Sequence, residues 1–179
     1  MTSRSSDSLT CFSAAILLLF SVSVSYTQRI AILTPDRTTQ STSLAEQLSD
    51  GFEGKLRVVD AGAAQSAFRS ITVDDPFNLT SEQGKSIGTV IGSDFFIIVK
   101  AVTQRRTSSA RPNYYEAYAA IYLVNSRTGF LDHWHLETKS GDTAAEAEKL
   151  LLGSTAAIAD GINARVRNSK LLSDPGPDR

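Results

Sequence analysis

The segment Leu79–Arg106, LTSEQGKSIGTVIGSDFFIIVKAVTQRR, constrains the fold more than any other part of the chain. Thr80 or Ser81 can cap a helix, and Gly92–Asp94 then turns the chain. The run that follows, Phe95–Arg106, is apolar on both faces over its first half, which is typical of a central strand covered on two sides. The segment therefore predicts a helix packed against the middle strand of a sheet.

This helix contains an unusual number of glycines. Each glycine in a helix costs about 1 kcal/mol relative to alanine, so we expect them to let the helix backbone approach the sheet closely. Gly84–Gly88 also matches the G-x-S-x-G pattern of a nucleophile elbow, which needs its serine between a strand and a following helix. Ser86 falls inside the predicted helix instead, and we expect no enzyme activity.

The whole pattern predicts an α/β (α+β) domain with a mixed sheet of about five strands and helices packed on it. The expected order of elements is β-α-β-α-α-β-β-β-α. Leu44, Leu48 and Phe52 recur at the spacing of one helical face, in a helix capped by Ser41 or Ser43. Strands are expected at 28–34, 55–60, 95–106, 114–124 and 130–138, and further helices at 63–70, 80–91 and 143–167.

The first 25 residues predict a signal peptide. Arg4 precedes the apolar run Cys11–Val24, which has the length of a signal-peptide core and is shorter than the roughly 20 residues of a membrane span. Cleavage near Ser25 is expected, and an uncleaved N-terminal anchor is the alternative. The globular domain then comprises 26–168, and 169–179 is expected to be a flexible tail.

Composition narrows the compartment and the partners. Cys11 is the only cysteine, so the chain after cleavage could form no disulfide, and export without disulfides favours a bacterial periplasm. The formal net charge of −1 argues against nucleic acid as a partner. Contact with a membrane is expected only through an uncleaved N-terminal segment.

A basic and aromatic group is the first candidate site. Arg105, Arg106 and Arg111 flank a polar connection between two predicted strands, and Tyr114 and Tyr118 share one face of the second strand. Such a group can bind a partner protein, whereas the simpler interpretation is a soluble loop tip.

Two histidines form the second candidate site. His133 and His135 lie two residues apart and so share one face of a strand, as metal ligands can. The chain has no third histidine, and the simpler interpretation is a solvated face with Trp134 packed inward. We expect no metal and no other cofactor.

Several segments together resemble a known group of domains: RIAIL at 29–33, LRVVD at 56–60, the run Ile87–Val102 and LVNSRTG at Leu123–Gly129. The chain resembles periplasmic domains related to the curli secretion lipoprotein CsgG, to LpoB and to the N-terminal domain of TolB. A weaker resemblance is to N-terminal domains of TonB-type envelope proteins. The resemblance implies a non-catalytic protein of the cell envelope that docks envelope protein partners during assembly or transport. The alternative is a periplasmic module that binds a small molecule or metal.

Overall fold

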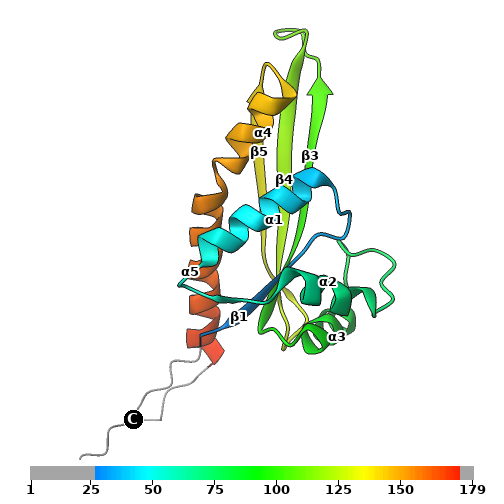
Figure 1. Ribbon diagram of the computed structural model, residues 1–179, viewed down its shortest axis with the longest axis vertical. Coiled ribbons are helices and arrows are strands. Elements are labelled where there is room, and N and C mark those ends of the chain that lie inside the picture. The colour runs from blue at the N-terminus through cyan, green and yellow to red at the C-terminus, as the bar shows by residue number, and fades with distance from the viewer. Residues whose placement is uncertain (1–26, 174–179) are drawn as a thin grey trace, which may run out of the picture.

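The computed structural model describes residues 27–173, and its centre is a mixed sheet of five strands in the order β2-β1-β3-β4-β5 (Figure 1). The middle position belongs to β3, as its two apolar faces predict. The expected fold class is therefore confirmed. The strands are β1 (Arg29–Leu33), β2 (Arg57–Val58), β3 (Phe95–Arg106), β4 (Tyr114–Asn125) and β5 (Leu131–Gly141). The helices are α1 (Thr39–Phe52), α2 (Ala61–Arg69), α3 (Ser81–Ile91), α4 (Ala144–Leu152) and α5 (Thr155–Ser173).

Parallel and antiparallel pairing meet at β3. Strand β1 runs parallel to both β2 and β3, whereas β3, β4 and β5 form an antiparallel meander. β3 and β4 pair along their full length, from Phe95 opposite Asn125 to Arg106 opposite Tyr114. The pairing with β1 ends at Ile98, so the outer half of the meander projects beyond the parallel part of the sheet.

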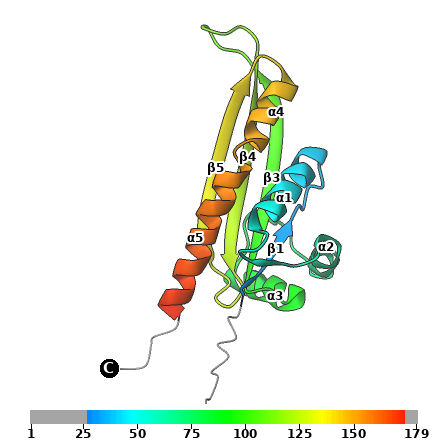
Figure 2. The same ribbon diagram turned by 60° about the vertical axis from the view of Figure 1, so that its left-hand side comes forward.

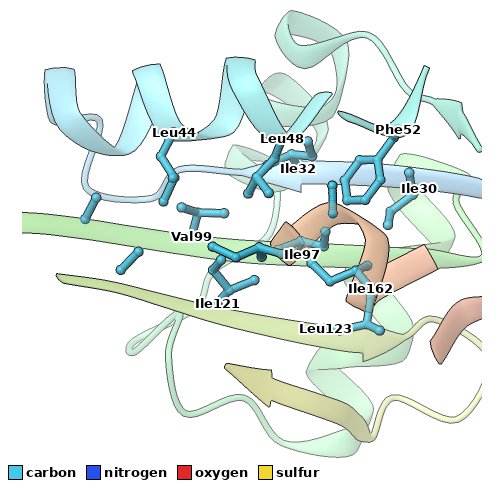
Figure 3. Close-up of a cluster of buried hydrophobic side chains, with 14 of the residues drawn as sticks. Ile30, Ile32, Leu44, Leu48, Phe52, Ile97, Val99, Ile121, Leu123 and Ile162 are labelled. Atoms are coloured by element: carbon cyan, nitrogen blue, oxygen red, sulfur yellow. The ribbon is translucent and has the colours of Figure 1, made fainter. Parts of the chain in front are cut away.

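Helices α1, α4 and α5 cover one face of the sheet and bury the larger core (Figures 1 and 2). Leu44, Leu48 and Phe52 are fully buried, which confirms the predicted apolar face of α1. They belong to the same cluster as Ile97 and Val99 of β3 (Figure 3). On the opposite face, α2 and α3 lie over β1 and the first half of β3 and leave the outer half of the meander open (Figure 1).

Side chains of α1 take the place of β1 where β1 ends. The backbone N–H of Ala101 donates to Ser41 Oγ at 2.9 Å, and the N–H of Thr103 donates to Gln40 Oε1 at 3.0 Å. Ser41 is fully buried. The helix is capped by Thr38, whose hydroxyl accepts from the N–H of Ser41, so the expectation that Ser41 or Ser43 caps it was wrong. The Ser41 hydroxyl therefore hydrogen-bonds to the central strand β3 instead of capping the helix.

The glycines of α3 allow close packing against the turn between β4 and β5, rather than against the sheet itself. A Cβ on Gly84 would lie 2.5 Å from the carbonyl oxygen of Gly129, and one on Gly88 would lie 2.2 Å from Ser126 Cβ. Gly129 has a φ of +72° and itself approaches the backbone of Ser81. α3 and the turn therefore meet backbone to backbone.

The C-terminal helical segment differs from its prediction in two ways. One helix was expected from 143 to 167, but the segment is divided into α4 and α5 around Gly153. The hydroxyls of Ser154 and Thr155 donate back to the carbonyls of Leu151 and Leu152, at 2.6 and 2.7 Å, which competes with helical bonding. The tail was expected from residue 169, but α5 continues to Ser173, since the first proline beyond it is at 175.

Two further expectations concern the length of β2 and the setting of the G-x-S-x-G segment. Strand β2 spans only Arg57–Val58, which is shorter than the predicted 55–60. Ser86 lies within α3, so the G-x-S-x-G segment lacks the strand–turn–helix setting of a nucleophile elbow. The predicted signal peptide, 1–25, and residues 174–179 of the predicted tail lie outside the described residues.

Replacing Ser41 by alanine should lower the free energy of unfolding by about 1–3 kcal/mol, because the buried N–H of Ala101 loses its acceptor. Urea unfolding followed by circular dichroism measures the change. Ser43→Ala in the same helix is the matched control and should have little effect. Equal stability of the two variants would contradict the role given to Ser41.

Replacing Gly88 by alanine should destabilise the protein by about 1–3 kcal/mol through overpacking against Ser126, although alanine is the better helix former. Gly161→Ala in α5 is the control, because a Cβ there meets nothing within 4 Å. That substitution should stabilise by up to about 1 kcal/mol. The same sign of change for both variants in urea unfolding would refute the close contact.

Candidate functional site

The open half of the sheet presents adjoining aromatic and apolar side chains. Tyr122 lies opposite Trp134 across β4 and β5, and Ala120 lies opposite Leu136. Trp134 is 48% exposed and Leu136 49% exposed. An exposed apolar patch of this kind marks an interaction site more often than a single exposed side chain does. We name it the open face, and its members are Val102, Tyr118, Ala120, Tyr122, Trp134 and Leu136.

A small apolar cavity of about 150 Å³ adjoins the open face at its inner end. Phe77, from the connection before α3, lies against Tyr122 with 5.8 Å between ring centroids. Lys100 Nζ lies 5.3 Å from the centroid of the Phe77 ring, in a cation–π arrangement. Leu131 also lines the cavity. The open face therefore ends in a shallow notch, which sequence reasoning did not predict.

The arginines at the tip of the β3–β4 hairpin are held by partners within the chain. Arg106 Nε lies 3.1 Å from Glu116 Oε2. Arg111 donates to the carboxylate of Asp142, and its guanidinium carbon lies 5.3 Å from the centroid of the Tyr114 ring. Each of these two positive charges is thus neutralised by a carboxylate, so this part of the tip is more aromatic than basic.

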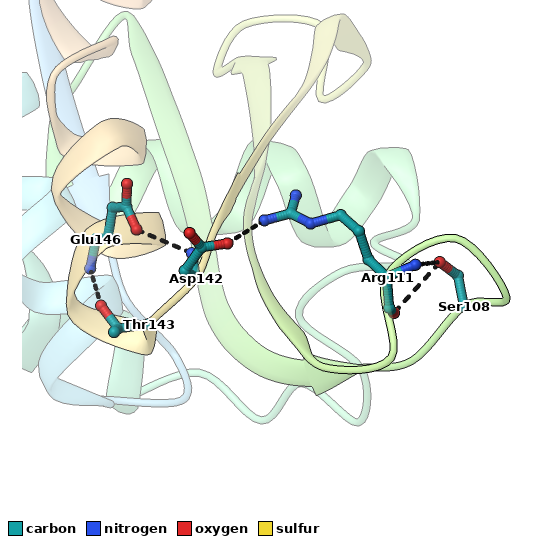
Figure 4. A network of polar contacts seen from close by, with 5 residues as sticks. All are labelled: Ser108, Arg111, Asp142, Thr143 and Glu146. Atoms are coloured by element: carbon teal, nitrogen blue, oxygen red, sulfur yellow. Dashed lines mark hydrogen bonds and ion pairs between the residues drawn. The ribbon is translucent and has the colours of Figure 1, made fainter.

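The Arg111–Asp142 pair connects the hairpin tip to the start of α4 (Figure 4). The backbone N–H of Asp142 donates to Glu146 at 2.8 Å, and the N–H of Glu146 donates to the hydroxyl of Thr143 at 3.2 Å. Thr143 is the N-cap residue of α4, as its spacing from Glu146 predicts. One exposed ion pair therefore links the tip to the first turn of α4, and the other two bonds order that turn itself.

The structure brings most of the predicted contact residues together. Tyr114, Tyr118 and Arg106 belong to the same side of the hairpin as the open face, because Arg106 lies opposite Tyr114 and the side chains alternate along each strand. Arg111 lies over Tyr114. Arg105 is the exception: it lies opposite Tyr115, on the other side, where it donates to Asn113 Oδ1.

The two histidines lie on the side of β5 that faces α5. His133 and His135 line a cavity together with residues of that helix, whereas Trp134 points to the open face. The expectation of a solvated histidine face with Trp134 packed inward was therefore wrong. The cause is a β-bulge near Leu123. Leu123 is paired with His133, whereas a ladder that continued regularly from the turn would pair Leu123 with Asp132.

The carboxylate of Glu137 already has two partners. His135 Nε2 lies 3.1 Å from Glu137 Oε2, and Lys139 Nζ lies 2.8 Å from Oε1. The bond from Lys139 is the main cause that lowers the pKa of Glu137. Within residues 27–173, no group of three or more His, Cys, Asp or Glu side chains could hold a metal ion. A metal at His133 and His135, which was the alternative to the expected absence of a metal, thus has no geometric support among these residues.

A larger cavity, of about 490 Å³, lies next to the turn between β4 and β5, beside Gly88 and Asp94. The hydroxyls of Ser93 and Ser126 are buried beside it and have no hydrogen-bond partner among residues 27–173. Both oxygen atoms are inaccessible to solvent, so a molecule in the cavity would not reach them. In the described part of the chain, no helix is long and apolar enough to span a membrane.

Comparisons with known proteins show the fold. No family model and no curated protein matches the chain. A lipoprotein from Neisseria meningitidis, GNA1162, superposes with a TM-score of 0.51 at 15% identity, covering 75% of this chain and 97% of that one. The hypothetical protein CT253 from Chlamydia trachomatis gives 0.47 at 13% identity, with 77% and 99% covered. The LpoB C-terminal domain from Salmonella enterica gives 0.37 at 12% identity, with 62% and 81% covered. The likeness to GNA1162 shows a fold shared with a bacterial lipoprotein.

Acidification should destabilise the protein through His133. Burial, followed by the positive charges of Arg165 and His135, lowers the pKa of His133 below its ordinary value of 6.5. Protonation is thus harder in the folded state, and stability falls as the pH drops from above 6.5 towards that lower pKa. Urea unfolding at pH 7.5 and 5.5 should show a smaller loss for His133→Gln than for the unmodified chain. An equal loss in both proteins would contradict this origin.

Proposed function

We propose that this chain is an exported, non-catalytic binding or scaffolding domain of the bacterial cell envelope. In this proposal it docks an envelope protein partner through the open face and the adjoining side of the hairpin tip. The observation that carries the proposal is the open face itself, where half-exposed Trp134 and Leu136 adjoin the tyrosines of β4. Aromatic side chains and arginine are enriched in protein interfaces, and the tip adds Arg106, Arg111 and Tyr114.

The geometry of this surface suits a rigid partner contact. Tyrosine and tryptophan supply large contact areas and lose little side-chain entropy. Tyr118 and Tyr122 stand on β4, which is paired on both sides. The tip is tied to α4 through Arg111 and Asp142. A partner would therefore meet a surface that is already ordered before binding, which reduces the cost of association.

The compartment rests on the sequence. The predicted signal peptide, the single cysteine within it and the resemblance to CsgG-related, LpoB and TolB N-terminal domains support a periplasmic location. A fold shared with a lipoprotein agrees with this assignment. The resemblance also supports a role in assembly or transport rather than in chemistry.

A photo-reactive amino acid placed at Tyr118 should form a cross-link to an envelope protein in the cells that make this chain. The cross-linked product should have a mass above that of two copies of this chain. The same amino acid at Leu150 is the matched control, since Leu150 is 47% exposed but lies on α4. Arg105, on the other side of the same hairpin, serves as a second control. Mass spectrometry of the cross-linked product identifies the partner.

The proposal requires a product at Tyr118 that is absent or much weaker at both control positions. No product at Tyr118, or the same yield at all three positions, would refute docking through the open face. A product at Arg105 alone would move the contact to the opposite side of the hairpin.

A further inference from the structure

Strand β5 is an edge strand whose outer side is open. Within residues 27–173 it pairs only with β4. It has eleven residues, Leu131–Gly141, and contains no proline. Proteins usually shorten, kink, cover or charge such an edge, because its free N–H and C=O groups can pair with another strand; of these devices, the described residues give most of β5 only its charged side chains, Glu137 and Lys139 among them. The bulge of β5 lies near its beginning, beside Leu131, and leaves the rest of the edge regular.

Helix α5 leaves room beside this edge. A cavity of about 280 Å³ separates the helix from β5 and is lined by His133, His135 and Glu137 on the strand and by Ala157 and Gly161 on the helix. A Cβ on Gly161 would meet nothing within 4 Å. Ile158 and Ile162 also line the cavity, but Ala157 and Gly161 leave space between them that side chains of an added strand could enter beneath α5.

We propose that a second copy of this chain occupies the edge, with its own β5 antiparallel to the first about a two-fold axis at Leu136. The two five-stranded sheets then become one continuous sheet. A two-fold interface requires each strand to be complementary to itself, and the sequence of β5 meets this requirement. About Leu136, His135 lies opposite Glu137 of the second copy, and Glu137 lies opposite its His135.

The other pairs about this axis are compatible with the same register. Leu136 lies opposite Leu136 of the second copy, so two half-exposed apolar side chains cover each other. Trp134 lies opposite Thr138 of the second copy, which leaves the indole on the open face. His133 lies opposite Lys139 of the second copy, and these two repel little at neutral pH because the lowered pKa of His133 keeps its imidazole uncharged.

Backbone bonds supply the affinity in strand addition, and the alternating side chains supply the specificity. Each Glu137 would keep its own His135 at 3.1 Å and its own Lys139 at 2.8 Å, and would lie beside the histidine of the other copy as well. The pairing uses the backbone edge of β5, whereas the proposed partner contact uses side chains of the open face, and Leu136 belongs to both. The mass of the unmodified chain in solution therefore tests the dimer alone, and the cross-link at Tyr118, on β4, tests partner docking alone.

Cysteine cross-linking tests the register. In a chain with Cys11→Ser, Leu136→Cys places two thiols directly opposite each other, at a Cα separation of about 4.5–5.5 Å that a disulfide can bridge. Mild oxidation should then convert most of the protein to a disulfide-linked dimer. Thr138→Cys is the matched control, since its two thiols would be four residues out of register, about 13 Å apart. Equal cross-linking at 136 and 138 would overturn the register.

Light scattering after size exclusion tests the dimer without any cysteine. At about 50 μM the unmodified chain should have the mass of two copies, and Leu136→Lys, which places like charges opposite each other, should have the mass of one. Leu150→Lys is an equally exposed apolar-to-charged change away from the edge, and it should leave the dimer intact. A monomeric unmodified chain, or a dimer that persists in Leu136→Lys, would overturn the proposal.

Discussion

The hydrogen bonds from the backbone of β3 to the side chains of Gln40 and Ser41 determine how the two halves of the sheet fit together. Strand β3 is longer than its parallel neighbour, so the N–H groups of buried Ala101 and partly buried Thr103 would lack partners in that strand. The first turn of α1 supplies acceptors to both. Because these bonds complete the edge of β3, the meander can extend beyond β1, and this extension creates the open face.

The extension also explains why the two faces of the sheet differ. On one side α1, α4 and α5 follow the meander outward and bury the odd-numbered residues of β3 and β4, such as Val99 and Ile121. On the other side α3 is fixed by its contact with the turn at Gly129 and cannot follow. The even-numbered side chains beyond Lys100 therefore gain no cover from the described helices, and the aromatic residues of β4 and β5 remain at the surface of this part of the chain.

Hydrophobic spacing was sufficient to predict the parts of the fold that depend on burial. The spacing of Leu44, Leu48 and Phe52 identified the buried side of α1, and the doubly apolar Phe95–Val99 identified the central strand. The role of Ser41 was not predictable, because a buried serine and a capping serine look the same in a sequence. The orientation of Trp134 depends on one extra residue in a ladder, which leaves no compositional signal.

Only those features of the candidate site that depend on local sequence were predictable. Tyr114 and Tyr118 share a side because strand alternation is local, whereas the partners of the arginines are distant in sequence. Asp142 lies 31 residues from Arg111, and only the completed meander and α4 bring them together. Arg105 and Arg106 are neighbours in the chain, yet alternation sends them to opposite sides of the hairpin.

The bulge at the start of β5 matters for any comparison between this chain and others of the same fold. A relative with a regular ladder after the turn would need its polar and apolar residues in the opposite order to present the same surface. An alignment that matches β5 residue by residue would then equate inward with outward positions. For this strand, the site of the extra residue has to be located before a side chain in one protein is taken as the equivalent of a side chain in another.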